Sequence, residues 1–329
     1  MANNERWYDI DGVSVPSVTT VLGGVVGKFG LIDWAVGQMY DHIGDWMERP
    51  DVGNNGPLVM AAKFREIKDE LIAQREDVGY RPARIGSLVH DLVHQSIRNP
   101  DLENGIGIGL NKSQVDGELR DLFFTYELEP TPEVVKQVAN CWMGWLQWCQ
   151  QYKVGTFPPD DGKLRDWWIT ESEIVVHTLS ADTAHYAGTV DLILESCHHT
   201  NRRYVLDIKT GSLQNDHLYQ VAAYAYAYEV MQLQEWCSEN EDNMMRFLDE
   251  GLGGVVAGVD FPGVDRGFLL QLNRNEPNST GRRYTLKEAR DWKSLYWMGF
   301  QRAFQWWEKH RSQTPGSMIS VEDFNKKVE

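Results

Sequence analysis

Two apolar segments separated by a short polar turn each contain an aspartate. They are AGTVDLIL (residues 187–194), which contains Asp191, and RYVLDIKT (residues 203–210), which contains Asp207. Apolar segments of this length between turn residues are typical of buried or half-buried β-strands. A carboxylate that is removed from water needs a cation, a hydrogen-bond cage or an exit to solvent. The sequence therefore predicts two strands whose aspartates have a partner elsewhere in the chain or in a ligand.

Alternation along a strand places Asp207 and Lys209 on the same face, because side chains two residues apart point the same way. If the strand with Asp191 pairs beside it, and Glu173 enters from the segment TESEIVV, three carboxylates and one lysine converge at a sheet edge. Hard oxygen ligands of this kind suit Mg²⁺ or Mn²⁺. Such an ion activates water for attack on a phosphodiester, and a lysine can orient that water or stabilise the developing charge.

The hydrophobic pattern changes period near residue 166. Before that point, apolar residues recur at helical spacing, and after it most segments alternate or run apolar as strands do. A short hairpin and a helix capped by Ser17 or Thr19 are expected at the start of the chain. Further helices are expected at 31–48, 57–77, 81–98, 131–152, 216–236 and 287–311, and strands at 167–179, 187–194, 203–210, 253–261, 267–272 and 282–286. Tryptophans at helical spacing are expected to pack in the core rather than to stack on bases.

Charge, cysteine content and hydropathy indicate which ligands and which cellular compartment suit this chain. The net charge of −16 is unfavourable for phosphate binding, although carboxylates that hold cations contribute to it. The four cysteines show no CxxC spacing, which suits a reducing compartment. The start of the chain lacks a signal-peptide pattern, and no segment has the ~18 apolar residues of a membrane helix. We expect an intracellular protein with no membrane partner, in the host cytoplasm if a phage encodes it.

Three segments in order carry a family resemblance. GTVDLI, then VLDIKTG, then HLYQVAAYAYA with Gln220 and Tyr224 resemble the strand acids, the D-x-K and the Q-x-x-x-Y helix of RecB-like nucleases in the PD-(D/E)XK superfamily. Upstream, IGSLVHD resembles the family helix whose histidine joins the metal site, which indicates His90. The opening VPSVTTVLG…LIDWA is similar to phage and mitochondrial RecB-like exonucleases.

The resemblance implies an α/β fold, with a restriction-endonuclease-like central mixed β-sheet flanked by helices. It implies a helical N-terminal region at 1–165, which contributes the metal-site histidine, and a nuclease core at 166–329, folded together as one unit. No cysteine follows Cys237, so the cysteine triplet that holds an iron–sulfur cluster in some relatives is missing from the sequence. We therefore expect Mg²⁺ or Mn²⁺ and no iron–sulfur cluster.

The resemblance also implies a role for each matching residue. Lys209 would be the catalytic lysine, and Gln220 with Tyr224 would brace the site and face the DNA. Glu173 would be the additional acid, although Glu171 shares its strand face and stays an alternative. The implied metal ligands are His90, Asp191, Asp207, the backbone carbonyl of Ile208, and Glu173.

His90 and His94 lie four residues apart on the expected helix, a spacing that also suits a pair of metal ligands. A surface or capping role is the more common one for such histidines. The resemblance favours His90 as the ligand, and the helical pattern predicts that His94 points away from the apolar stripe.

The function that follows from these expectations is hydrolysis of DNA phosphodiesters by metal-activated water, as an exonuclease acting on ends or single strands. No Ser, Cys or Tyr lies among the acids in the motif strands, so we expect no covalent intermediate. Two alternatives remain: a non-cleaving nucleic-acid-binding or assembly subunit, and a restriction-type endonuclease. A recombination or replication protein is a candidate partner.

Overall fold

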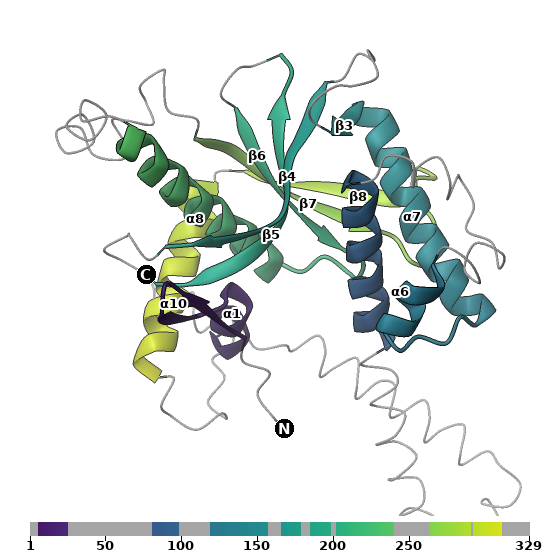
Figure 1. The fold of residues 1–329 in the computed structure, drawn as a ribbon, viewed down its shortest axis with the longest axis horizontal. Helices are drawn as coiled ribbons and strands as arrows, with labels where there is room; N and C mark the ends of the chain where they lie inside the picture. The colour runs from purple at the N-terminus through teal and green to yellow at the C-terminus, as the bar shows by residue number, and fades with distance from the viewer. Residues whose placement is uncertain are drawn as a thin grey trace, which may run out of the picture.

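The computed structural model describes residues 6–25, 81–98, 119–156, 166–178, 185–198, 202–239, 263–290 and 292–310. The helices expected at 31–48 and 57–77 and the strand expected at 253–261 lie outside these residues. In the described part of the chain, one mixed sheet lies between two groups of helices (Figure 1). The expected α/β fold with a central mixed sheet is therefore confirmed.

The central sheet has the strand order β3-β4-β5-β6-β7-β8. Its strands are β3 (Val154–Thr156), β4 (Trp167–His177), β5 (Ala187–Ser196), β6 (Arg203–Lys209), β7 (Val264–Leu272) and β8 (Tyr284–Ala289). The pairs β3/β4 and β6/β7 are parallel, and the other neighbours are antiparallel. The two strands with the motif aspartates, β5 and β6, are thus direct neighbours in the middle of the sheet.

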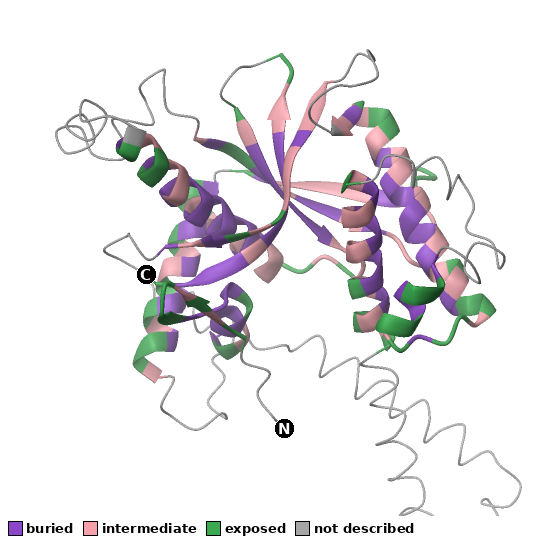
Figure 2. Cartoon of the chain, viewed as in Figure 1, coloured by how far each residue is buried: buried purple, intermediate pink, exposed green. Residues whose placement is uncertain are grey.

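Helices cover both faces of the sheet. The side chains of β6 accordingly alternate between two hydrophobic cores, one on each face. Tyr204, Leu206 and Ile208 pack against the helix over residues 81–98 and against α6 (Arg120–Thr125) and α7 (Pro132–Tyr152). Val205 faces the opposite core, which contains α1 (Val18–Val25), α8 (Asp216–Glu239) and α10 (Met298–His310). Buried residues accordingly concentrate in the strands and on the inner sides of the helices (Figure 2).

The long helix α7 begins and ends where its sequence predicts. The Thr131 side chain accepts a hydrogen bond of 3.3 Å from the Val134 N–H, and Pro132 occupies the first turn. Lys153 ends the helix in the left-handed conformation with φ 46°. The tryptophans of this helix are buried in the core, as expected: Trp142, Trp145 and Trp148.

The chain starts with a hairpin that leads into a short helix. The elements are β1 (Trp7–Ile10), β2 (Val13–Pro16) and α1 (Val18–Val25). Asp11 and Gly12 form the turn with φ 52° and 79°, a conformation that Asp-Gly favours in two-residue hairpins. The Ser17 hydroxyl accepts a 2.9 Å hydrogen bond from the Thr20 N–H, so Ser17 is the cap of α1.

The C-terminal helices differ from the expectation at their start. The Ala-rich helix is α8 (Asp216–Glu239), and the aromatic segment forms η1 (Trp292–Trp297), a π-helix, and α10 (Met298–His310). A helix was expected from residue 287, but β8 extends to Ala289, which pairs with Gly267 of β7. The expectation was wrong there because pairing with a neighbouring strand outweighs a local helical pattern.

The division into a region at 1–165 and a core at 166–329 that fold as one unit stays a prediction. One hydrophobic core does contain residues from both, since Leu88 and Trp142 pack in the same cluster as Leu192 and Leu270. None of the helices in the described part of the chain combines the length and hydropathy needed to cross a bilayer.

Two phenylalanines test the C-terminal helix as part of the core. Phe300 of α10 is fully buried, with its ring 4.8 Å from that of Tyr186, whereas Phe124 of α6 is 85% exposed. We expect Phe300→Ala to lower the free energy of unfolding by about 3–5 kcal/mol, because it leaves a cavity. Phe124→Ala, the control, should change it by less than about 0.5 kcal/mol. Urea unfolding measured by tryptophan fluorescence checks both values, and equal effects would contradict the assignment of α10 to the core.

Candidate active site

The two motif aspartates lie where β5 and β6 separate. The antiparallel pairing runs from Glu195↔Arg203 to Leu192↔Leu206 and stops there, one residue before Asp191 on β5 and Asp207 on β6. The Asp191 side chain reaches across, and its Oδ2 accepts a 2.5 Å hydrogen bond from the Ile208 N–H. The expectation that these strands pair side by side is confirmed, and the Asp191 carboxylate has a hydrogen-bond donor from the neighbouring strand.

Asp207 and Lys209 form an ion pair on one face of β6. The Lys209 Nζ lies 2.6 Å from Oδ2 of Asp207, as the period of two predicts. Asp207 is almost completely buried, and its Oδ2 receives no aligned hydrogen bond from any described residue. A buried carboxylate with a single cationic neighbour retains capacity to bind a further positive group.

His90 reaches the site from the helix over residues 81–98. Its Nδ1 lies 3.3 Å from Oδ1 of Asp191. Gly86, one turn earlier, allows the helix to approach the end of β6, since a Cβ there would lie 3.0 Å from the Thr210 hydroxyl oxygen. The structure thus brings His90 to Asp191, as the resemblance implies.

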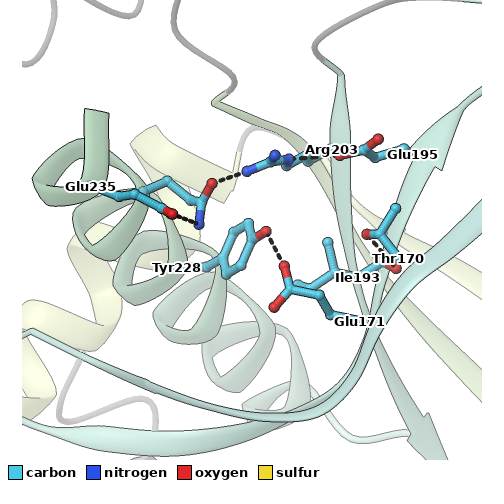
Figure 3. Close-up of polar contacts among 8 residues, drawn as sticks. Thr170, Glu171, Ile193, Glu195, Arg203, Tyr228 and Glu235 are labelled. Carbon is cyan, nitrogen blue, oxygen red and sulfur yellow. Dashed lines mark hydrogen bonds and ion pairs between the residues drawn. The ribbon is translucent and has the colours of Figure 1, made fainter. Parts of the chain in front are cut away.

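Glu173 joins this group from β4, whereas Glu171 does not. One ligand atom from each of His90, Glu173 and Asp191 can be chosen so that all lie within 4.8 Å of one another. Glu171 instead accepts a 2.6 Å hydrogen bond from the Tyr228 hydroxyl of α8 (Figure 3). Strict alternation would have placed the two glutamates on one face.

The backbone of β4 explains the separation of the two glutamates. The register with β5 shifts at a β-bulge between Ile169 and Glu171, but from Glu171 onward the pairing keeps one register, so the bulge itself does not separate the two glutamates. Glu173 itself has φ 53°, a left-handed conformation that is uncommon for a residue with a Cβ. Such strained backbone costs about 1–3 kcal/mol and is concentrated at functional sites.

Gln220 and Tyr224 lie one turn apart on α8 and are both buried. The Gln220 amide donates a 2.7 Å hydrogen bond to the Tyr224 hydroxyl. Gly188 of β5 lies directly against the Tyr224 ring, and a Cβ at Gly188 would come within 2.3 Å of it. The glycine in GTVDLI is therefore required by the close approach of this tyrosine.

One cavity of about 710 Å³ connects these residues. Its lining includes every side chain of the expected site: His90, Glu173, Asp191, Asp207, Lys209, Gln220 and Tyr224. Arg6, Tyr8 and Tyr126 also line the cavity, and no sequence pattern predicted them because they lie outside the motif segments.

Further polar side chains surround the acids in the cavity. His94, which was expected to point away from the apolar stripe, lines the same cavity as His90, because residues four apart share one side of a helix. Its buried Nδ1 has no hydrogen-bond partner among the described residues. The fold also brings Ser87 and Tyr126 from other elements to the lining of the cavity.

Comparison with known protein families decides the identity. A sequence model of the PD-(D/E)XK nuclease superfamily matches residues 63–255, more than half of the chain. The chain belongs to the PD-(D/E)XK nuclease superfamily. None of the curated proteins compared with the chain matches it significantly.

Membership accounts for the architecture around the site. The matched region contains His90 and both motif strands, and the curved mixed sheet flanked by helices is the restriction-endonuclease-like α/β fold. Members of this superfamily are hydrolases that cleave nucleic acids with divalent metal ions, so membership suggests a metal-dependent nuclease.

The two aspartates of this PD-(D/E)XK site have pKa values that are shifted in opposite directions. Burial and the neighbouring Asp191 raise the pKa of Asp207 to about 6, although Lys209 opposes the rise. Burial also acts to raise the pKa of Asp191, but His90, Lys209 and the Ile208 N–H together hold it below its usual value. Asp191 in turn raises the pKa of His90 despite burial. The two carboxylates therefore differ in how strongly their surroundings favour the charged form.

The residues present fit a divalent cation. The group of His90, Glu173 and Asp191 offers one nitrogen and two carboxylate oxygens, with the buried Asp207 carboxylate in the same cavity. Glu173 is more than one-third exposed, but partial burial and the Asp191 charge raise the pKa of its carboxyl, and His90 opposes them. Carboxylates that are crowded together in this way gain from a cation that neutralises them.

The two glutamates of β4 provide a matched test of the metal centre. We expect Glu173→Gln to weaken Mn²⁺ binding about tenfold or more, because it removes a charged ligand. Glu171→Gln should change it by less than about twofold, since Glu171 contacts Tyr228 instead. Isothermal titration calorimetry on both variants measures the difference. A larger effect at Glu171 would show that the wrong glutamate has been assigned to the centre.

Proposed function

We propose that the protein is a RecB-like DNA exonuclease of the phage and mitochondrial type that hydrolyses phosphodiester bonds with Mg²⁺ or Mn²⁺. The observation that carries this proposal is the pair of aspartates at the separation of β5 and β6, with Lys209 2.6 Å from Asp207 and His90 3.3 Å from Asp191. A protein that only binds nucleic acid has no use for such a carboxylate group, because it repels phosphate when no cation is present.

In this proposal each residue has a defined role. Asp191, Asp207, Glu173, His90 and the backbone carbonyl of Ile208 would hold the divalent ion. That ion would polarise the phosphodiester and lower the pKa of an attacking water.

The remaining groups act on the substrate. The Lys209 ammonium orients the water or stabilises the charge that develops on the phosphate oxygens. Gln220 and Tyr224, which are fixed to each other by a hydrogen bond, brace the site and face the DNA. Burial raises the pKa of Tyr224 well above its usual value, so its phenol stays protonated. This supports direct attack by water rather than a covalent intermediate.

The finer features of the proposal rest on the sequence resemblance. VPSVTTVLG near the N-terminus supports the exonuclease type, and the substrate class we propose is DNA ends or single strands. We further propose that no iron–sulfur cluster is held, since no cysteine follows Cys237, and that residues 1–165 and 166–329 fold as one unit. The proposed location is the interior of the cell, with a recombination or replication protein as partner.

A cleavage assay tests the proposal directly. Purified protein is incubated with end-labelled linear, covalently closed circular and single-stranded DNA, in Mg²⁺, Mn²⁺ or EDTA. We expect mononucleotides or short products from linear or single-stranded DNA, no cleavage of closed circles, and no activity in EDTA. Cleavage of closed circular duplex would indicate an endonuclease, and binding without cleavage in either metal would indicate a non-cleaving subunit.

A substitution at Lys209 distinguishes a role in catalysis from a role in metal binding. We expect Lys209→Ala to lower the single-turnover rate about a hundredfold or more, because it removes a charge that acts on the transition state. Mn²⁺ affinity measured by calorimetry should change far less. Lys136→Ala, at a lysine that is 61% exposed and lies outside the cavity, is the matched control and should cleave at the wild-type rate. Loss of Mn²⁺ affinity with an unchanged single-turnover rate in Lys209→Ala would reverse the assigned role.

A further inference from the structure

Arg6 lies outside the matched family region but lines the catalytic cavity. Its main chain is attached to the start of α1 on both sides. The Arg6 N–H donates to the Thr20 hydroxyl oxygen at 2.9 Å, and the Arg6 carbonyl accepts from the Thr20 hydroxyl at 3.0 Å and from the Ser17 N–H at 2.8 Å. These three hydrogen bonds fix the point from which the arginine side chain extends.

The N-terminal hairpin is also fixed to the strand that carries Asp191. The Tyr8 hydroxyl shares a 3.0 Å hydrogen bond with the hydroxyl of Thr189, two residues before Asp191 on β5. The Arg6 guanidinium carbon lies 5.1 Å from the centre of the Tyr8 ring, which is a cation–π contact. Arg6 and Tyr8 therefore form one wall of the cavity at a fixed position relative to the acids.

Arg6 differs from the other basic groups of the cavity in its partners. Lys209 pairs with Asp207, and His90 pairs with Asp191. Among the described residues no ion pair within 4.0 Å joins the Arg6 guanidinium to a carboxylate, although the Arg6 charge acts to lower the pKa of the nearby Glu173 carboxyl. Arg6 is exposed, so its hydrogen-bond donors are accessible to a ligand from solvent.

We propose that Arg6 is a substrate-positioning residue that binds a backbone phosphate of the nucleic-acid strand next to the phosphate being cleaved. This inference rests on the proposed nuclease function. The guanidinium fork matches two non-bridging phosphate oxygens, and the Tyr8 ring reduces the freedom that binding would otherwise remove. Because Arg6 extends from the cavity wall that it forms with Tyr8, while His90 and Lys209 lie at the two aspartates, the target proposed for Arg6 is a neighbouring phosphate.

The salt dependence of binding tests this role. The probe is a fluorescein-labelled single-stranded DNA 20-mer with Mn²⁺, and binding is measured by anisotropy between 50 and 200 mM salt in a Lys209→Ala background that slows cleavage. One lost phosphate contact reduces the slope of log K against log salt by about 0.7 for a single strand. We expect this reduction and about tenfold weaker binding in Arg6→Gln. Arg6→Lys keeps the charge and should restore most of the slope.

Arg290→Gln is the matched control, because Arg290 is 84% exposed and lies outside the cavity. It should leave the slope and the affinity unchanged. In the chain with Lys209 intact, Arg6→Gln should raise KM about tenfold and change kcat by less than about threefold. An unchanged slope in Arg6→Gln, or an equal change in Arg290→Gln, overturns the inference.

The two proposals fail in different ways. If the chain with Lys209 intact cleaves DNA but Arg6→Gln keeps its slope and KM, the nuclease function stands and the role of Arg6 is wrong. If the chain binds the 20-mer through Arg6 but does not cleave it in Mg²⁺ or Mn²⁺, the phosphate contact of Arg6 stands, and the nuclease function, with the placement of that contact beside a cleaved phosphate, is wrong. If it neither binds nor cleaves, both are wrong.

Discussion

The hydrogen bond from the Ile208 N–H to Asp191 is the interaction on which the site depends. It forms where β5 leaves β6, after the last pair Leu192↔Leu206. Regular pairing beyond this point would close the gap between the two strands at Asp191 and Asp207. The separation instead opens a cavity beside the carboxylates, and the Asp191 side chain bridges the two strands there. A buried carboxylate that accepts a backbone hydrogen bond keeps its charge at a lower cost in free energy.

The carboxylates of this site repel one another, and the cationic groups of the protein offset this repulsion only in part. His90 and Lys209 hold the pKa of Asp191 low, but burial raises that of Asp207 to about 6 despite Lys209. Glu173, in a strained backbone conformation, adds a third carboxylate. Such a group repels a phosphate strand until a cation neutralises it, so metal and substrate binding are expected to be coupled. Arg6 would supply attraction for phosphate from the cavity wall that it forms with Tyr8.

Close packing positions the parts that come from distant segments. Gly86 lets the helix over residues 81–98 approach the end of β6, and Gly188 makes room for the Tyr224 ring of α8. These helices lie on opposite faces of the sheet, as Figure 1 shows. Both reach the cavity where β5 and β6 separate. A side chain at either glycine would move a wall of the cavity rather than an exposed loop.

The sequence by itself determined the α/β fold, most strand positions, and the shared face of Asp207 and Lys209, because alternation within one strand is a local property of the chain. The resemblance added His90. The resemblance favoured Glu173 but left Glu171 open, and only the tertiary structure separates the two, since the positive φ of Glu173 breaks the alternation in β4 and Glu171 contacts Tyr228. No sequence pattern predicted that Arg6 lines the cavity, because its position depends on hydrogen bonds between the N-terminal hairpin, α1 and β5. Local periodicity does not encode such long-range contacts, and the packed fold decides them.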